Sequence, residues 1–330
     1  MTTYSKYFDS FSGQRVLVLG DVMLDSYIRG DVQRVSPEAP VPIVSFKNRE
    51  ERLGGAANVA LNLVALGAEP ILCSVIGDDE DGARFLHEVS ANSLSTQGIL
   101  QSKQRQTTVK IRIIGNNQQL LRVDKEQTNP IDADLENRMI DFVKSQIETG
   151  QIAALVFEDY NKGLLTERLI SEVIEMCNSN GIPTTVDPKK DNFMAYRGVT
   201  LFKPNFKELK EGLGMDFSFE KGARFEDAVE QLKSKLNAEI LFVTLSEHGV
   251  YIKHSREPGV YLDAHRRAIR DVSGAGDTVI AVATMGLVAG MPPKGIAALA
   301  NIAGGLVCEK SGVVSITLDE LKAELERLAL

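Results

Sequence analysis

The sequence predicts an α/β fold in which a mostly parallel sheet carries helices on both faces and a small antiparallel β lid stands beside it. Short apolar runs alternate with amphipathic stretches along most of the chain, and two segments break this alternation. Such alternation is typical of parallel sheets, whose strands need helical crossovers. With 330 residues, 43% of them hydrophobic, the chain can bury a large core. We expect one domain over residues 1–330.

The predicted strands are continuous apolar runs, as expected for strands buried on both faces of a sheet. They lie at 15–20, 71–76, 154–159, 183–188, 200–205 and 240–245. Between them, apolar residues recur with the helical period. The predicted helices lie near 54–67, 80–91, 132–148, 166–180, 206–213 and 222–237.

Residues 25–53 and 97–124 depart from the alternation. Between 109 and 114, apolar residues alternate with basic ones, which predicts a strand with one apolar face. Gly, Asn, Asn and Gln at 115–118 are typical of a tight turn between antiparallel strands. We expect both segments to form an antiparallel sheet that serves as a lid, a dimer contact or both. A second copy could cover its unpaired edges, so we expect a homodimer through the lid.

The last third of the chain predicts two helices rich in small residues. The first begins at Gly274 and ends near Gly290, and the second runs from about Pro293 to Lys310. Pro292 and Pro293 separate them, because proline after a helix end prevents its continuation. Helix packing explains the alanines and glycines, but it does not explain the sequence DVSGAGD at the start of the first helix.

The composition excludes several classes of protein. A formal net charge of −8 argues against a protein that coats nucleic acid or anionic lipid. Three widely spaced cysteines predict neither a disulfide framework nor a cysteine metal cluster. The longest weakly polar stretch, 278–291, is too short and too rich in glycine to span a bilayer. The first residues do not form a secretory signal, so we expect a cytoplasmic protein.

The segment DVSGAGDT at 271–278 begins a predicted helix, and its glycines would let a phosphate approach the backbone. The free N–H groups of a first helical turn point at such an anion, and the helix dipole adds to the attraction. Asp277 would repel the phosphate, so its place suits a base that takes a proton from an attacking hydroxyl. The alternative is a helix start that Asp277 only stabilises, and the motif alone does not decide.

A second motif, LGGAANVALNLVALG at 53–67, places two glycines at the start of another predicted helix. The amides of Gly54 and Gly55 and the side chain of Asn58 could bind sugar hydroxyls. Small residues at this spacing also let a helix pack closely against a sheet. For this motif taken alone, packing is the simpler explanation.

Polar residues follow five predicted strands at their carboxyl ends, where ligands bind in open α/β sheets. They are Asp21, 159–162, 187–190, 203–208 and 244–247. Single positions of this kind are often turns or caps, but five together indicate a ligand site along one edge. Two nucleotide schemes are excluded. None of the 27 glycines precedes a lysine, as a Walker A motif requires, and no G-x-G-x-x-G follows the first strand.

These motifs resemble those of the ribokinase (PfkB) family of sugar kinases, over essentially the whole chain. Residues 54–63 resemble the N-terminal signature of that family, and 271–281 resemble the C-terminal one. Four further stretches resemble the bacterial kinases of D-glycero-β-D-manno-heptose 7-phosphate: 34–44, 115–124, 158–163 and 186–190. Because the sequence ends at Leu330, it resembles the stand-alone form of these kinases, without an adenylyltransferase domain.

The resemblance implies a ribokinase-like fold and phosphoryl transfer from ATP to the C1 hydroxyl of the heptose 7-phosphate. The product would be the 1,7-bisphosphate, in the biosynthesis of ADP-heptose and the lipopolysaccharide core. Asp277 would be the base. The amides of Gly274, Ala275 and Gly276 would hold the phosphoryl group in transfer.

The resemblance also implies where the cofactors bind. Asn205 and Glu208 match the N-x-x-E pattern of the family and would organise Mg²⁺ through water. Asp271 matches a residue that in some relatives helps to bind a monovalent cation such as K⁺. The nucleotide would lie against four further residues: Thr244, Ser246, Gly249 and Asn301.

For the substrate, the resemblance implies that five residues hold the sugar hydroxyls: Asp21, Asp25, Gly54, Gly55 and Asn58. The phosphate already on the sugar needs cations, and the candidates are Lys110, Arg112, Arg122 and Lys162. Strand parity puts Lys110 and Arg112 on one face, although they could instead solvate the outside of the lid. The alternative functions are another ribokinase-family sugar or sugar-phosphate kinase, and a sugar or nucleotide sensor without turnover.

Overall fold

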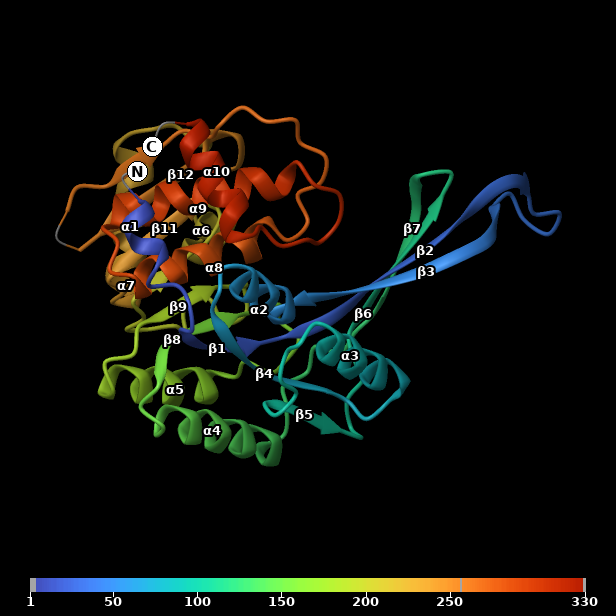
Figure 1. Cartoon of the computed structure of the whole chain (residues 1–330), viewed down its shortest axis with the longest axis horizontal. Helices are drawn as coiled ribbons and strands as arrows, with labels where there is room; N and C mark the ends of the chain where they lie inside the picture. Colours follow the sequence, from blue (N-terminus) through green and yellow to red (C-terminus); the bar gives the residue numbers. More distant parts are fainter. Residues whose placement is uncertain (1–3, 256, 329–330) are drawn as a thin grey trace.

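The computed structural model describes residues 4–255 and 257–328. Its central sheet has nine strands in the order β13-β12-β11-β10-β9-β8-β1-β4-β5. The pairings from β11 to β5 are parallel, and those of β12 with β11 and β13 are antiparallel. Helices cover both faces of this sheet, and a separate four-stranded sheet projects from one side as a long arm (Figure 1).

All the predicted sheet strands are confirmed: β1 (Arg15–Gly20), β4 (Glu69–Gly77), β8 (Ile152–Glu158), β9 (Thr184–Asp187), β10 (Leu201–Phe202) and β11 (Ile240–Thr244). The strand predicted at 200–205 is much shorter than expected, because Pro204 has no N–H to donate and Asn205 already caps a helix. Three strands were not predicted: β5 (Ile99–Ser102), β12 (Val250–His254) and β13 (Val260–Leu262).

All the predicted helices are confirmed: α2 (Ala56–Ala65), α3 (Glu80–Ala91), α4 (Ala133–Ile147), α5 (Glu167–Ser179), α6 (Phe206–Leu213), α7 (Ala223–Leu236), α8 (Ala275–Val288) and α9 (Pro293–Cys308). Several begin where a side chain accepts a backbone N–H of the first turn, as Asp79, Asp132 and Thr166 do. Three short helices were not predicted: α1 (Ser5–Phe8), the 3₁₀ turn η1 (Ser246–His248) and α10 (Leu318–Arg327).

The sheet separates two hydrophobic cores, and the side chains of β1 alternate between them. Val16 and Val18 lie in the core with α2, α8 and α9, whereas Leu17 and Leu19 lie in the core with α4, α5 and α7. Helix α8 is buried without a break from Asp277 to Gly286. A helix that is apolar all round must lie inside the protein, so packing around residues 277–286 holds α8 in place, while its first residues, 274–276, are only half-buried.

The projecting sheet consists of β2 (Val22–Val35), β3 (Pro42–Gly55), β6 (Val109–Gly115) and β7 (Gln118–Lys125), in the order β3-β2-β6-β7. Its two hairpins are antiparallel, but β2 pairs with β6 in parallel, because both strands leave the main body in the same direction. The predicted turn is confirmed: Asn116 and Asn117 have φ of 51° and 64°.

The predicted lid segment 97–124 is too long at its start. Residues 99–102 form β5, which pairs with β4 at the edge of the main sheet. Ile99 belongs to the main hydrophobic core and is 8% exposed, so burial of this side chain holds the strand on the body.

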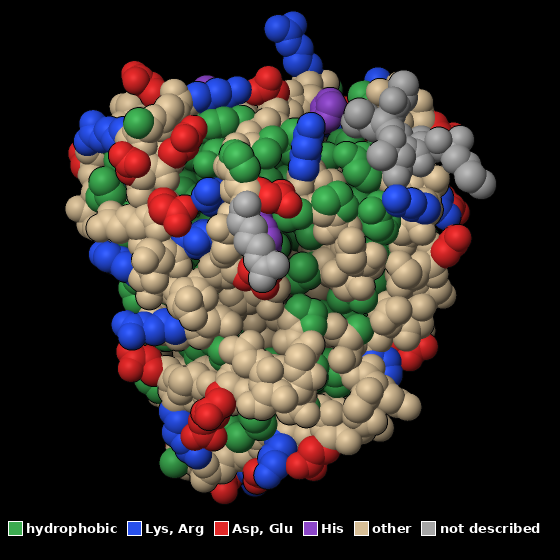
Figure 2. Space-filling model, turned by 90° about the vertical axis from the view of Figure 1, so that its left-hand side faces the viewer, with side chains coloured by type: hydrophobic (Ala, Val, Ile, Leu, Met, Phe, Trp, Pro, Cys, Tyr) green, Lys and Arg blue, Asp and Glu red, His purple; other side chains and the backbone are tan. Residues whose placement is uncertain are grey.

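The surface away from the projecting sheet carries both signs of charge. Figure 2 shows that face, with acidic and basic side chains interspersed among hydrophobic and polar groups. Within residues 4–255 and 257–328, no helix is long and apolar enough to cross a membrane.

Candidate active site

The start of α8 lies at the centre of the site. Gly274 precedes the helix with φ of 79°, a left-handed conformation that glycine adopts easily. Asp277 follows in the first turn, is 4% exposed, and accepts two hydrogen bonds from other parts of the chain. Asn58 Nδ2 of α2 donates to Oδ2 at 2.6 Å, and the Tyr160 hydroxyl donates to Oδ1 at 3.1 Å. The carboxylate is therefore held by two elements besides its own helix.

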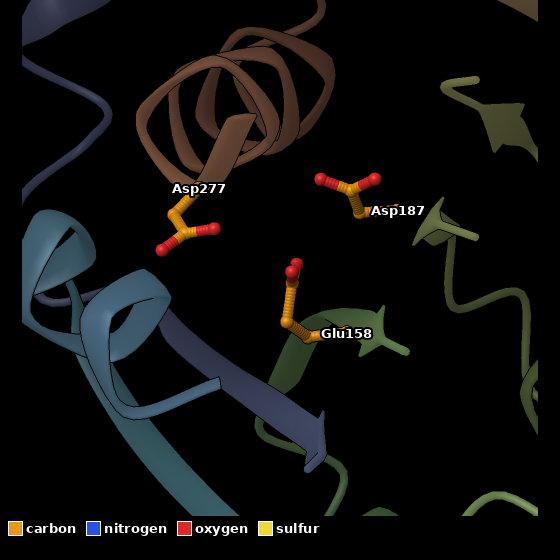
Figure 3. Close-up of side chains that lie close together, drawn as sticks. All are labelled: Glu158, Asp187 and Asp277. Atoms are coloured by element: carbon orange, nitrogen blue, oxygen red, sulfur yellow. The ribbon is translucent and has the colours of Figure 1, made fainter. Parts of the chain in front are cut away.

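Two further buried carboxylates face Asp277. Glu158 ends β8, Asp187 ends β9, and one oxygen from each of the three residues lies within 4.8 Å of the others. Figure 3 shows all three side chains pointing into one space between the start of α8 and the two strand ends. Burial raises the pKa of Asp277, and burial with the nearby charge of Asp187 raises the pKa of Glu158 well above its usual range.

Two lysines that follow the ends of β9 and β10 balance part of this negative charge. Lys203 Nζ lies 2.8 Å from Asp187 Oδ2, and Lys189 Nζ lies 3.1 Å from Glu208 Oε1. Lys203 is 3% exposed, and a buried lysine of this kind needs an anionic partner. The sequence placed both lysines at the ligand edge without giving either a role.

A cavity of about 600 Å³ lies against the start of α8. Its apolar wall includes Val250, Ile269 and Val279, which suits a flat heterocyclic ring. All four residues expected to line a nucleotide also line this cavity: Thr244, Ser246, Gly249 and Asn301. Of the three residues expected to hold its phosphate, Ala275 and Gly276 line it as well. Asp277 itself does not line this cavity.

Arg267 also lines this cavity, although no sequence motif points to it. Its side chain is 3% exposed and forms ion pairs with Glu309, 3.1 Å away, and with Glu324 of α10. A β-carbon at Gly305 would lie 2.6 Å from its Nε, so the glycine in α9 makes room for the guanidinium. No local pattern indicated this residue, because its partners lie more than forty positions later in the chain.

Asn205 and Glu208, expected near Mg²⁺, bind each other at the start of α6. Asn205 Oδ1 accepts the Glu208 N–H at 2.9 Å, and Glu208 Oε2 accepts the Asn205 N–H at 2.8 Å. Because Lys189 contacts Oε1, both carboxylate oxygens of Glu208 already have partners. This is a capping box, which explains the N-x-x-E spacing by helix geometry as well.

Asp21 and Asp271, two further predicted site residues, bind backbone amides. The Asp21 carboxylate accepts the N–H groups of Tyr160, Lys162 and Leu164 at 3.0 to 3.3 Å. Asp271 accepts the N–H groups of residues 273 and 312, both at 2.9 Å. Asp21 thus holds the loop that carries Tyr160, and Asp271 holds the segment before α8.

Lys110 and Arg112 turn toward the main body rather than toward solvent. Lys110 Nζ lies 5.2 Å from the ring centre of Tyr160, the residue that donates to Asp277. Arg112 forms an ion pair with Asp25, which is 4% exposed. Both basic groups therefore lie on the face of the projecting sheet that adjoins the acid cluster.

The remaining predicted substrate residues are less concentrated. Arg122 pairs with Asp124 and is half exposed, and Lys162 pairs with Glu126 at 2.7 Å. Gly54 and Gly55 end β3 instead of beginning the helix. A β-carbon at Gly54 would lie 2.5 Å from Asp25 Oδ2, so close contact with that carboxylate explains this glycine.

Comparison with known proteins places this site in context. Residues 14–320 match the family model described as pfkB family carbohydrate kinase. The chain is 37% identical over 329 residues to the bifunctional protein HldE of Syntrophotalea carbinolica, and 41% identical over 319 residues to that of Methylobacillus flagellatus. The two aligned regions cover 100% and 94% of this chain, but only 66% and 63% of the length of those relatives.

Solved structures share the fold at low sequence identity. Phosphofructokinase-2 from Escherichia coli, in complex with potassium, matches with a TM-score of 0.78 at 16% identity, covering 97% of this chain and 100% of that one. A putative ribokinase from Agrobacterium tumefaciens matches with a TM-score of 0.75 at 17% identity, covering 96% of this chain and 99% of that one. The ribokinase-like α/β fold is confirmed.

Replacing Asp21 by asparagine should destabilise the protein. The amide would keep one acceptor oxygen and turn its NH₂ toward backbone N–H groups, which should lower the free energy of unfolding by about 1.5–3 kcal/mol in denaturant titrations. Burial, with the charge of Asp159, raises the pKa of Asp21 to about 6. As pH falls from 7 toward 5, Asp21 binds a proton in the folded protein before it does so in the unfolded chain, and this stabilises the wild type. Asp21→Asn cannot bind this proton, so the difference in free energy of unfolding between the two proteins should widen.

The control for this change is Asp227→Asn, on the exposed side of α7, which should leave stability within about 0.5 kcal/mol of wild type. Equal effects of the two variants, or a difference that narrows as pH falls, would show that the three amide contacts do not hold the loop.

Proposed function

The chain belongs to the pfkB family of carbohydrate kinases, and from this premise we propose that it phosphorylates the C1 hydroxyl of D-glycero-β-D-manno-heptose 7-phosphate. The product would be the 1,7-bisphosphate, a precursor of ADP-heptose for the lipopolysaccharide core. One observation carries the proposal. The buried carboxylate of Asp277 lies at the start of α8, beside a cavity large enough for a nucleotide. On its other side, Tyr160 connects it to the basic face of the projecting sheet, where Lys110 lies.

The residues around Asp277 can perform the proton transfer. Asn58 and Tyr160 fix the orientation of its carboxylate, and the raised pKa of Asp277 makes it a stronger base than an exposed aspartate. The amides of Gly274, Ala275 and Gly276 would hold the γ-phosphoryl group at the positive end of the α8 dipole. Asp277 would then take the proton of the C1 hydroxyl as it attacks.

The family uses ATP and Mg²⁺, and Mg²⁺ bound here would neutralise charge on the phosphoryl group in transfer. The apolar cavity fits the adenine, and Thr244, Ser246, Gly249 and Asn301 would line it. Asn205 and Glu208 would take part in organising Mg²⁺ through water. Asp271 would support a monovalent cation such as K⁺ behind the phosphate site.

Lys110 is the strongest candidate for the substrate's own phosphate. Burial lowers the pKa of Lys110, which shows that its amine is partly removed from water. Among the residues that the structure describes, no carboxylate lies within ion-pair distance of it, whereas Arg112, Arg122 and Lys162 each have one. A sugar phosphate would supply the missing anion, and Arg112 would assist through its place two residues along the same strand.

The small sheet would also form a dimer contact. By strand register, Phe46, Leu121 and Val123 share the face that Lys110 and Arg112 do not occupy, and they are 67%, 54% and 45% exposed. Exposed apolar side chains gathered on one face are typical of an interface. We propose a cytoplasmic homodimer of single kinase domains, each spanning the whole chain.

Asp277→Asn should lower kcat by about 10²–10⁴, because an amide cannot accept the hydroxyl proton. The side chains are nearly equal in size and the residue does not line the cavity, so ADP affinity should stay near that of wild type. Steady-state kinetics and calorimetric ADP titration measure the two quantities. Near wild-type turnover in this variant would exclude Asp277 as the base.

The substrate is tested by comparing kcat/KM for heptose 7-phosphate, free heptose, fructose 6-phosphate and ribose. Heptose 7-phosphate should be preferred, and Lys110→Ala should raise its KM about tenfold or more, with little effect on free heptose. Lys47→Ala, an exposed lysine of the same sheet, is the control. Preference for another sugar, or an equal loss on both heptoses, would point to a different member of the family. Absence of Mg²⁺-dependent ADP release with every sugar would favour a sensor.

Phe46→Asp should convert the dimer to a monomer, because a charge cannot be buried unpaired at the contact. Light scattering after size exclusion gives the mass directly. Gln119→Asp, an exposed position on β7, is the control and should remain dimeric. A monomeric wild type, or a dimeric Phe46→Asp, would remove the small sheet as the interface.

A further inference from the structure

Glu158 is the least satisfied polar side chain near the site. It is 0% exposed, and neither of its carboxylate oxygens has a hydrogen-bond partner among the described residues. A carboxylate removed from water without partners is costly, so an unmet acceptor in a folded core needs a reason. Nothing in the proton transfer by Asp277 requires Glu158.

The side chain of Glu158 points at two other acids. Figure 3 shows it directed from the end of β8 toward the space between Asp187 and Asp277. One oxygen from each residue lies within 4.8 Å of the others, and all three residues are at most 4% exposed. Of the three acids, only Asp187 has lysines within ion-pair distance among the described residues, Lys203 at 2.8 Å and Lys189 at 3.9 Å. Because Lys189 also pairs with Glu208, the two lysines leave negative charge between the three acids.

We propose that Glu158, Asp187 and Asp277 form a binding site for a divalent cation, with Glu158 as a direct ligand. Carboxylate oxygens are the ligands that Mg²⁺, Mn²⁺ and Ca²⁺ prefer. Around Mg²⁺, neighbouring ligand oxygens are about 2.9 Å apart and opposite ones about 4.2 Å, so the three carboxylates, whose oxygens lie within 4.8 Å of one another, would move closer together to bind the ion directly. Each residue supplies one oxygen, and Asp277 keeps its second oxygen for a proton.

The site adjoins the cavity at the start of α8. Gly276 lines that cavity, and a β-carbon there would lie only 3.1 Å from Asp187 Oδ2. With glycine at this position, no side chain of residue 276 stands between Asp187 and a phosphate held by the first-turn amides, and Lys203 Nζ lies nearby, 3.8 Å from where that β-carbon would be. The function of the bound cation in phosphoryl transfer rests on the kinase proposal, but the binding of the cation does not.

The proposed cation site lies at other residues than Asn205 and Glu208, the pair that the family resemblance implies for Mg²⁺. Both oxygens of Glu208 already accept contacts, one from the Asn205 N–H and one from Lys189, whereas both oxygens of Glu158 are free of them. A cation that binds in the absence of nucleotide should therefore depend on Glu158 more than on Glu208.

The test is Mn²⁺ binding to the whole protein without nucleotide or sugar, followed by the electron paramagnetic resonance signal of free Mn²⁺. Glu158→Gln should weaken binding about tenfold or more, because affinity at oxygen sites depends on ligand charge. The matched control, Glu211→Gln on the exposed side of α6, should stay within about twofold of wild type, and Glu208→Gln should lose less affinity than Glu158→Gln. Thermal unfolding gives a second measurement: Mn²⁺ should raise the Tm of wild type but not that of Glu158→Gln.

The proposal is overturned if Glu158→Gln binds Mn²⁺ as tightly as wild type, which would make Glu158 a neutral buried acid. It is also overturned if wild type does not bind Mn²⁺, or if Glu208→Gln is the variant that loses binding. If Glu158→Gln does not fold, Glu158→Asp replaces it; its shorter carboxylate should weaken binding measurably. If Glu158→Gln loses Mn²⁺ binding but keeps kinase activity, the proposed kinase function remains supported. If Mn²⁺ binding depends on Glu158 but the protein has no kinase activity, the cation site remains supported and the kinase proposal fails.

Discussion

The contact between Asp277 and its two partners is the interaction on which the rest of this structure depends. Asn58 comes from the helix that follows the projecting strands, and Tyr160 from the loop after β8. A buried carboxylate is tolerated in a protein core only where such donors meet it. The three segments must therefore pack in one arrangement, which places the start of α8 against the carboxyl ends of the parallel strands.

That arrangement determines the electrostatics of the site. The chain is acidic overall, with a net charge of −8, and it gathers three buried carboxylates beside the start of α8. Lys189 and Lys203 compensate for part of this charge from the strand ends. Under the proposed function, the positive end of α8 and a bound cation would supply the remainder, so that an acidic protein could bring two anionic substrates together.

The projecting sheet contributes to the site through the same residues. Asp21 holds the loop after β8, and that loop places Tyr160 between Asp277 and Lys110. The ring of Tyr160 thereby connects Lys110 on the arm to Asp277 on the main body. The apolar residues on the opposite face of the arm remain available for a second copy.

The sequence by itself determined the helices and strands, and the edge of the main sheet at which the polar site residues gather. Apolar periodicity, helix caps and the Asn116–Asn117 turn are local properties, so the strands, the helices and the carboxyl-end placement of Asp187 and Lys203 could be predicted. Only the tertiary structure decided which polar groups are already satisfied. Both carboxylate oxygens of Asp21 and of Glu208 accept contacts, those of Glu158 accept none from the described residues, and Arg267 pairs with Glu324 of α10. These contacts join residues whose chain separation carries no periodic signal, because they arise from packing between elements and not from the pattern within one.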